Sequence, residues 1–284
     1  MLESLYELMG LTFVIATMVS MGLSLTMRTI AGPLSSGRFV AMAVAVNFVA
    51  VPAAAWLLTE LFSLDGSLAT GLILVGLAAG APGLPKMAEI AKVDRATATS
   101  LMVLLIVATI VVVPLALPWL LPGVEVGFWD VASGLVLLIL VPLALSIFVQ
   151  ERYPDLAGSA QPYATQVSTI SLVLLMVLMV VLNWSDVVGL FGSGGLFASL
   201  LLVVVAAGIG FLLGGSDRDV RWVMALGSGQ RNIAAAMVVA ATNFGDEPDV
   251  LVMIVVYSLI TLLVMVPISA ELGRRAKAAS EQLA

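Results

Sequence analysis

The sequence predicts an all-α membrane protein with nine transmembrane helices, two of which are broken. Of the 284 residues, 61% are hydrophobic and 11% are charged, whereas soluble domains average roughly 45–50% apolar and 25% charged residues. Nine apolar segments follow one another, and most reach the about 20 residues that one span requires. Loops rich in Lys and Arg alternate with acidic loops. We therefore expect a polytopic membrane protein without a separate soluble domain.

The nine segments are joined by short connections. The segments cover residues 4–27, 38–61, 68–92, 97–121, 128–150, 163–183, 195–215, 221–244 and 249–271. Turn signals between them include Ala31-Gly32-Pro33, Ser63-Leu64-Asp65-Gly66 and Asp246-Glu247-Pro248-Asp249.

The order of the segments indicates an internal repeat. The third and eighth segments are both interrupted, and Pro114 and Pro267 each close the segment that follows. Residues 4–121 and 163–271 then form two four-helix repeats, with residues 128–150 as a connector, in one transmembrane domain over 1–284. Because five spans separate equivalent helices, the two repeats have opposite orientations in the membrane, as in many secondary transporters.

The basic residues of the loops predict the orientation. They lie on one side of the membrane, which holds Arg28, Arg38, Lys92, Arg95, Arg152, Arg218, Arg221, Arg274, Arg275 and Lys277. Loops rich in Lys and Arg face the cytoplasm. We expect the C-terminus in the cytoplasm, the N-terminus outside, and a bacterial inner membrane as the location.

Two spans contain features that a lipid-facing helix does not tolerate. The first break has Gly80, Pro82, Gly83 and Pro85 just before Lys86, and the second has Gly227 and Gly229 just before Arg231. Glycine and proline weaken a helix, and a charge at the bilayer centre costs roughly 2.5–3.5 kcal/mol on insertion scales. We expect both breaks to meet and to line a polar site.

The side chains of that site have a functional and a structural interpretation. Its predicted members are Asn47, Lys86, Glu89, Ser228, Gln230, Arg231 and Asn232. The two cations would receive a small carboxylate or another organic anion, or a fixed positive charge would replace a bound metal cation. Structurally, Lys86 would pair with Glu89, Arg231 would bind carbonyls freed at the opposite break, and Asn47 would join two helices.

The absence of cysteine and histidine narrows the chemistry. It excludes disulfides, thiolate metal sites, histidine proton relays and Ser-His or Cys-His catalysis. Glu3 and Glu7 at the N-terminus are not typical of a signal peptide. We expect no cofactor, and as partners a small organic anion and the lipid bilayer, with no nucleic acid.

Several motifs resemble the bile acid:sodium symporter family, including its bacterial members. They are Met21-Gly22-Leu23-Ser24-Leu25, Asn47-Phe48, Pro52-Ala53-Ala54-Ala55-Trp56-Leu57-Leu58, Leu72-Ile73-Leu74-Val75-Gly76, Gly229-Gln230-Arg231-Asn232, Ala234-Ala235-Ala236 and Asn243-Phe244. The resemblance implies a core domain of crossed, broken helices and a panel domain that work by alternating access. It also implies uptake of an organic anion coupled to sodium.

The chain departs from the family at positions that hold sodium. Leu84 and Pro85 stand where bacterial members have Ser-Asn, Gly227 stands for a glutamate and Arg231 for a glutamine. Asn232 is kept, and Asn47 replaces another ligand glutamine. A positive charge repels a cation bound beside it. These departures from the family therefore predict a transporter that works without sodium or uses protons through Glu89.

We expect a secondary transporter of a small organic anion, not an enzyme. One alternative is a membrane sensor or scaffold with a transporter-like fold that does not transport. Another is an intramembrane enzyme, for which a dyad of Ser228 and Lys86 is the remaining option.

Overall fold

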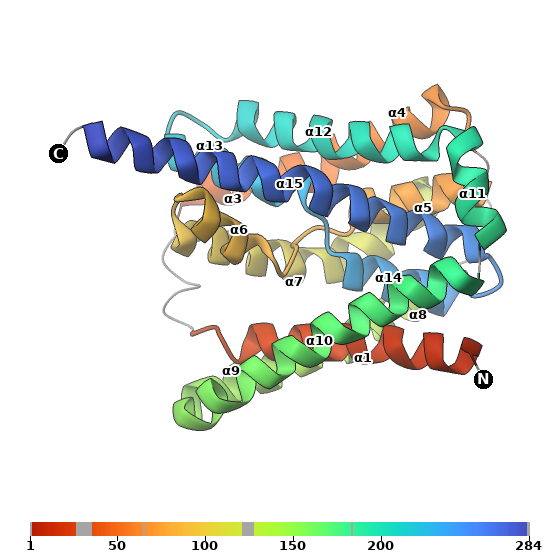
Figure 1. Cartoon of the computed structure of the whole chain (residues 1–284), viewed down its shortest axis with the longest axis horizontal. Helices are drawn as coiled ribbons and strands as arrows, with labels where there is room; N and C mark the ends of the chain where they lie inside the picture. The colour runs from red at the N-terminus through yellow and green to blue at the C-terminus, as the bar shows by residue number, and fades with distance from the viewer. Residues whose placement is uncertain (1, 27–35, 65, 121–127, 183, 283–284) are drawn as a thin grey trace.

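Helices are the only regular elements in residues 2–26, 36–64, 66–120, 128–182 and 184–282, the part of the chain that this computed structural model describes (Figure 1). In it, 7 helical stretches are long and apolar enough to cross a membrane. They are Ser4–Gly22, Gly37–Leu61, Arg95–Leu120, Phe128–Arg152, Pro154–Met179, Gly195–Leu213 and Pro248–Ala278. Each matches one predicted segment. The turn predicted at Ala31-Gly32-Pro33, and Asp65 in the second, lie outside the described residues.

Six of these stretches contain uninterrupted α-helices or helices with one wide turn. They are α1 (Leu2–Gly22), α3–η1–α4 (Gly37–Ala45, Val46–Ala50, Val51–Leu61), α7 (Arg95–Leu120), α8–η2–α9 (Phe128–Leu135, Val136–Leu140, Val141–Arg152), α12 (Gly195–Leu213) and α15 (Pro248–Gln282). The seventh, α10 (Pro154–Leu182), begins earlier than the predicted segment, and α11 (Trp184–Ser193) occupies a stretch expected to be a loop. Hydropathy does not detect the early start of α10 or the helix α11, because both lie next to a predicted span and not within it.

The two predicted breaks are present. The third segment is divided into α5 (Gly66–Leu77) and α6 (Leu84–Ala91), and the eighth into α13 (Arg218–Gly229) and α14 (Ile233–Asn243). The unwound linkers are residues 78–83 and 230–232. Two details differ from the prediction: Pro85 lies in the first turn of α6, where proline is tolerated, and Gly227 and Gly229 are still helical.

The wide turns η1 and η2 are π-helical, and each precedes a proline. In η1, the N–H of Val51 donates to the carbonyl of Val46, five residues earlier. The next donor in this pattern would be Pro52, which has no N–H. The carbonyl of Asn47 is therefore left without a helical donor.

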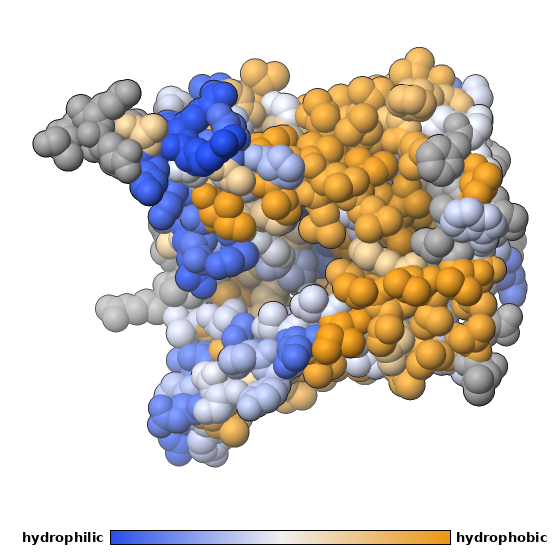
Figure 2. Space-filling model, viewed as in Figure 1, coloured by the Kyte–Doolittle hydropathy of each residue, from blue (hydrophilic) through white to orange (hydrophobic). Residues whose placement is uncertain are grey.

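The helices form two layers (Figure 1). The panel layer consists of α1, α8–η2–α9 and α10, and the core layer of α3–η1–α4, α5–α7 and α12–α15. The layers touch where α8 packs against α14 and α7, and also where α1 meets α14 and α10 meets α15. Figure 2 shows hydrophobic residues over the middle and right of the view, across α15 and the right-hand end of α10. Hydrophilic residues gather at the left edge, and the surface is hollowed between α10 and α15 on that side.

Candidate functional site

The two linkers cross in the core layer and are hydrogen-bonded to each other. The backbone N–H of Asn232 donates to the carbonyl of Ala78 over 2.8 Å. The side chain of Asn232 also caps α14, since its Oδ1 accepts from the N–H of Ala235 at 3.0 Å. On the other linker, the hydroxyl of Thr109 accepts from the N–H of Ala79 and donates to its carbonyl, at 3.1 and 3.0 Å. Each linker is thus fixed through its own backbone.

Arg231 joins the crossing to two other helices. Its guanidinium is buried and donates from Nε to the carbonyl of Val75 at 3.1 Å, and from Nη2 to the carbonyl of Gly76. Nη1 donates to Oδ1 of Asn47 at 2.9 Å, and Nη2 also donates to the carbonyl of Asn47 at 3.3 Å. This is the contact that the structural interpretation of Arg231 anticipates, with one addition in Asn47.

The carbonyls that receive Arg231 are free for identifiable reasons. Val75 and Gly76 belong to the last turn of α5, where carbonyls lack intrahelical donors. The carbonyl of Asn47 is free because Pro52 follows the π-helical turn. Asn47 is itself fully buried, and its Nδ2 donates to the carbonyl of Ala43 at 3.0 Å, which turns Oδ1 toward Arg231.

The electrostatic character of the crossing is positive. The partners that the structure gives to the Arg231 guanidinium are carbonyl and amide oxygens, all uncharged. The C-terminal end of α5 carries the negative end of the helix dipole, equivalent to roughly half a charge. A guanidinium at that end is favourable, but the dipole compensates the full positive charge only in part.

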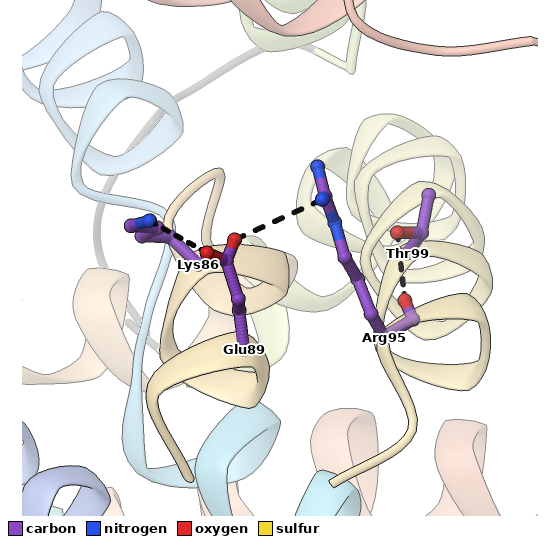
Figure 3. Close-up of polar contacts among 4 residues, drawn as sticks. All are labelled: Lys86, Glu89, Arg95 and Thr99. Carbon is purple, nitrogen blue, oxygen red and sulfur yellow. Dashed lines mark hydrogen bonds and ion pairs between the residues drawn. The ribbon is translucent and has the colours of Figure 1, made fainter. Parts of the chain in front are cut away.

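Lys86 lies away from this crossing. Figure 3 shows Lys86 and Arg95 on either side of Glu89, with Nζ of Lys86 3.0 Å from Oε1 and Nη1 of Arg95 3.7 Å from Oε2 of the carboxylate. The side chains of Lys86 and Glu89 are 68% and 48% exposed. The predicted site is therefore divided: Asn47, Gln230, Arg231 and Asn232 come together in the core, and Lys86 and Glu89 form a surface ion pair. Ser228 is buried within α13.

A cleft between the layers reaches the crossing. It has a volume of about 210 Å³ and is lined by α1, α10, α15 and both linkers, with Gln230 and Arg231 in its core wall. The Nε2 amide of Gln230 is buried and has no hydrogen-bond partner among the described residues. A second cavity of about 500 Å³ lies between the same layers and is lined by Tyr6, Glu7, Leu138, Met237 and other mainly apolar residues.

Four hydroxyl residues that were not among the predicted site residues also line the cleft. Thr17 of α1 and Ser168 of α10 line the cleft, together with Ser258 and Thr261 of α15. A signal for them exists in the sequence: Thr17, Ser20 and Ser24, and Gln161, Thr165 and Ser168, recur at helical spacing in apolar segments.

Comparisons with known proteins agree with one another. Residues 11–190 match the Sodium Bile acid symporter family. Over 245 residues the chain is 22% identical to a probable sodium/metabolite cotransporter of the chloroplast from Arabidopsis thaliana. That alignment covers 85% of the chain and 60% of the plant protein, so the chain spans less than two thirds of the length of this relative.

Proposed function

The chain belongs to the sodium bile acid symporter family, and from this premise we propose that it is a secondary transporter of a small organic anion. The observation that carries the proposal is the Arg231 guanidinium, which is 3% exposed and whose partners among the described residues are all uncharged. A buried charge without a counter-ion costs several kcal/mol. An anion in the adjacent cleft would lower this cost, so the resting site favours a negatively charged solute.

We further propose that transport does not need sodium. A sodium ion at the crossing would require oxygen ligands, and the carbonyls of Val75, Gly76 and Asn47 already accept hydrogen bonds from Arg231. A sodium ion close to the guanidinium would also meet repulsion. The residues present therefore do not fit a sodium ion at this position. A permanent cation in the chain performs the same electrostatic role at the end of α5.

The proposed architecture is nine crossings in two inverted repeats. The pairs α5–α6 and α13–α14 each follow the course of one predicted span, which added to the 7 long helices gives nine. Repeats over residues 4–121 and 163–271, a connector over 128–150 and a single domain over 1–284 remain our proposal. So do the bacterial inner membrane, the external N-terminus and the cytoplasmic C-terminus, which rest on the positive-inside rule.

Alternating access is supported by the two cavities. Both lie between the panel and core layers, and neighbouring apolar residues line different cavities: Phe13 and Met176 line the cleft, and Val14 and Met179 line the larger cavity. Movement of one layer against the other would open one cavity and close the other.

Uptake into liposomes tests the proposal. Purified protein in liposomes should take up radiolabelled small carboxylates equally well with sodium or with choline as the external cation. Uptake in the Arg231→Gln variant should fall by at least tenfold. Uptake that requires sodium in the unmodified protein contradicts the sodium-independent mechanism, and retention of anion uptake by Arg231→Gln contradicts the role of the guanidinium.

A further inference from the structure

The panel layer carries two pairs of hydroxyl groups between α1 and α10, one of which lines the cleft. Oγ1 of Thr17 lies 2.5 Å from Oγ of Ser168, and one turn along the helices Oγ of Ser20 lies 2.6 Å from Oγ1 of Thr165. Both pairs join α1 to α10. Of the two, the pair of Thr17 and Ser168 lines the cleft.

The direction of these hydrogen bonds can be deduced. The hydroxyl of Thr17 donates to the carbonyl of Phe13 at 2.6 Å, so its single hydrogen is used. In the contact with Ser168, Thr17 must then be the acceptor and Ser168 the donor. A hydroxyl has one donor and two acceptor positions. The pair therefore offers spare lone pairs, chiefly on Ser168, and accepts hydrogen bonds from whatever enters the cleft.

The core wall of the cleft carries Gln230 and Arg231 beside the hydroxyl residues Ser258 and Thr261. The buried Nε2 amide of Gln230 has hydrogens without a partner in the described part of the chain. The neighbouring Arg231 has five N–H groups, of which its four hydrogen bonds leave one. The core wall thus holds a buried amide donor and a buried positive charge beside two hydroxyls, and the facing panel wall accepts hydrogen bonds through Thr17 and Ser168.

We propose that this cleft selects a small hydroxylated organic anion, with its anionic group against Gln230 and Arg231 and its hydroxyl donating to the pair of Thr17 and Ser168. The inference rests on the proposed function, since it names the solute class of the same site. The volume of about 210 Å³ is below the roughly 300–1,000 Å³ of sites for drug-sized ligands. A solute that contacts both walls links the panel layer to the core layer. Its hydroxyl group then contributes to closure of the cleft between the two layers.

Lactate and propionate test this assignment, because they differ by one hydroxyl. Liposomes with the unmodified protein should take up lactate about tenfold faster than propionate at equal concentration, since a site built for a hydroxyl discriminates against an analogue without it. The variant Thr17→Val/Ser168→Ala should bring the ratio close to one. Thr17→Ser, which keeps the hydroxyl, should retain the preference.

A matched control separates recognition from helix packing. Ser20→Ala/Thr165→Val removes the equivalent hydroxyl pair outside the cleft and should keep the preference for lactate. Equal uptake of both anions by the unmodified protein overturns the inference while leaving the proposed function intact. Loss of the preference in the control variant also overturns it, because the hydroxyls would then act through packing. Uptake of neither anion overturns the inference, and if other small carboxylates are not taken up either, the proposed function is contradicted as well.

Discussion

At the scale of the residue, the geometry of Arg231 matters as much as its charge. Its planar fork reaches the end of α5 and the π-helical turn η1 at once, with Val75 and Gly76 on one side and Asn47 on the other. A lysine at the same position would bring a point charge with three donors and no fork. A lysine that keeps the positive charge should therefore not keep the hydrogen bonds that join the second linker to α5 and η1.

The variant Arg231→Lys tests this distinction. We expect it to lose at least two of the four hydrogen bonds, and each bond to a charged group contributes about 1.5–3 kcal/mol. The free energy of unfolding should fall by roughly 3 kcal/mol or more, measured as a lower melting temperature in detergent. Arg275→Lys is the control, because Arg275 is 73% exposed and binds Glu271 at the surface. Equal melting temperatures for the two variants would contradict the account.

Lys86 should behave in the opposite way. Its ion pair with Glu89 is largely exposed, and exposed pairs contribute about 0–1 kcal/mol. We expect Lys86→Ala to change the melting temperature by less than 2 °C or so and to leave lactate uptake within about twofold of the unmodified protein. A loss of lactate uptake as large as that expected for Arg231→Gln would indicate that Lys86 belongs to the solute site.

Lys86 and Arg231 show which features of a site can be predicted from the sequence. Both follow a glycine-rich stretch within an apolar segment, so the sequence pattern alone predicts the same role for both. They differ because α6 begins at Leu84 and turns Lys86 to the surface, whereas Arg231 lies in the unwound linker between α13 and α14. The starting turn of a short helix decides which way a side chain faces, and sequence patterns predict such boundaries poorly.

At the scale of the element, the two glycines of the first linker, residues 78–83, differ in whether they could be replaced by a residue with a side chain. Gly80 has a φ of +89°, and a Cβ there would lie 2.6 Å from the backbone nitrogen of Ile106. At Gly83, by contrast, the nearest atom to an added Cβ is Oε1 of Gln230 at 3.5 Å, which is an ordinary contact. The two positions are three residues apart but tolerate a side chain differently.

The pair Gly80→Ala and Gly83→Ala tests this difference. A left-handed conformation in a residue other than glycine costs about 1–3 kcal/mol, and the close contact with α7 adds to this. Gly80→Ala should thus lower the melting temperature clearly, and Gly83→Ala should stay within about 1 kcal/mol of the unmodified protein. Similar melting temperatures would indicate that the linker is not held against α7.

Pro52 shows what the sequence predicts at this scale and what it does not. A proline inside an apolar segment indicates a local irregularity. It does not reveal that the irregularity is a π-helical turn, nor that the freed carbonyl of Asn47 points at Arg231, which lies 184 residues away in sequence. Existence and order of the helices follow from local composition, but such a contact depends on the crossing of distant segments.

At the scale of the whole molecule, the two cavities both lie at the interface between the panel and core layers and are lined by different residues. Met87 lines the cleft and Ala241 lines the larger cavity. If solute transport requires the layers to move, these two positions should exchange access to water. Under the proposed alternating access, access to water at one position should decrease when access at the other increases.

Thiol labelling can follow this exchange, because the chain contains no cysteine of its own. We expect Met87→Cys to react with a membrane-impermeant maleimide from the side of the basic loops and Ala241→Cys from the other side. Saturating lactate should change the two labelling rates in opposite directions, by about threefold or more. Ser159→Cys, an exposed position that lines neither cavity, should react at a constant rate. Rates at Met87 and Ala241 that rise or fall together would contradict alternating access, since a joint change indicates loosening of the whole interface and not an exchange between its two sides.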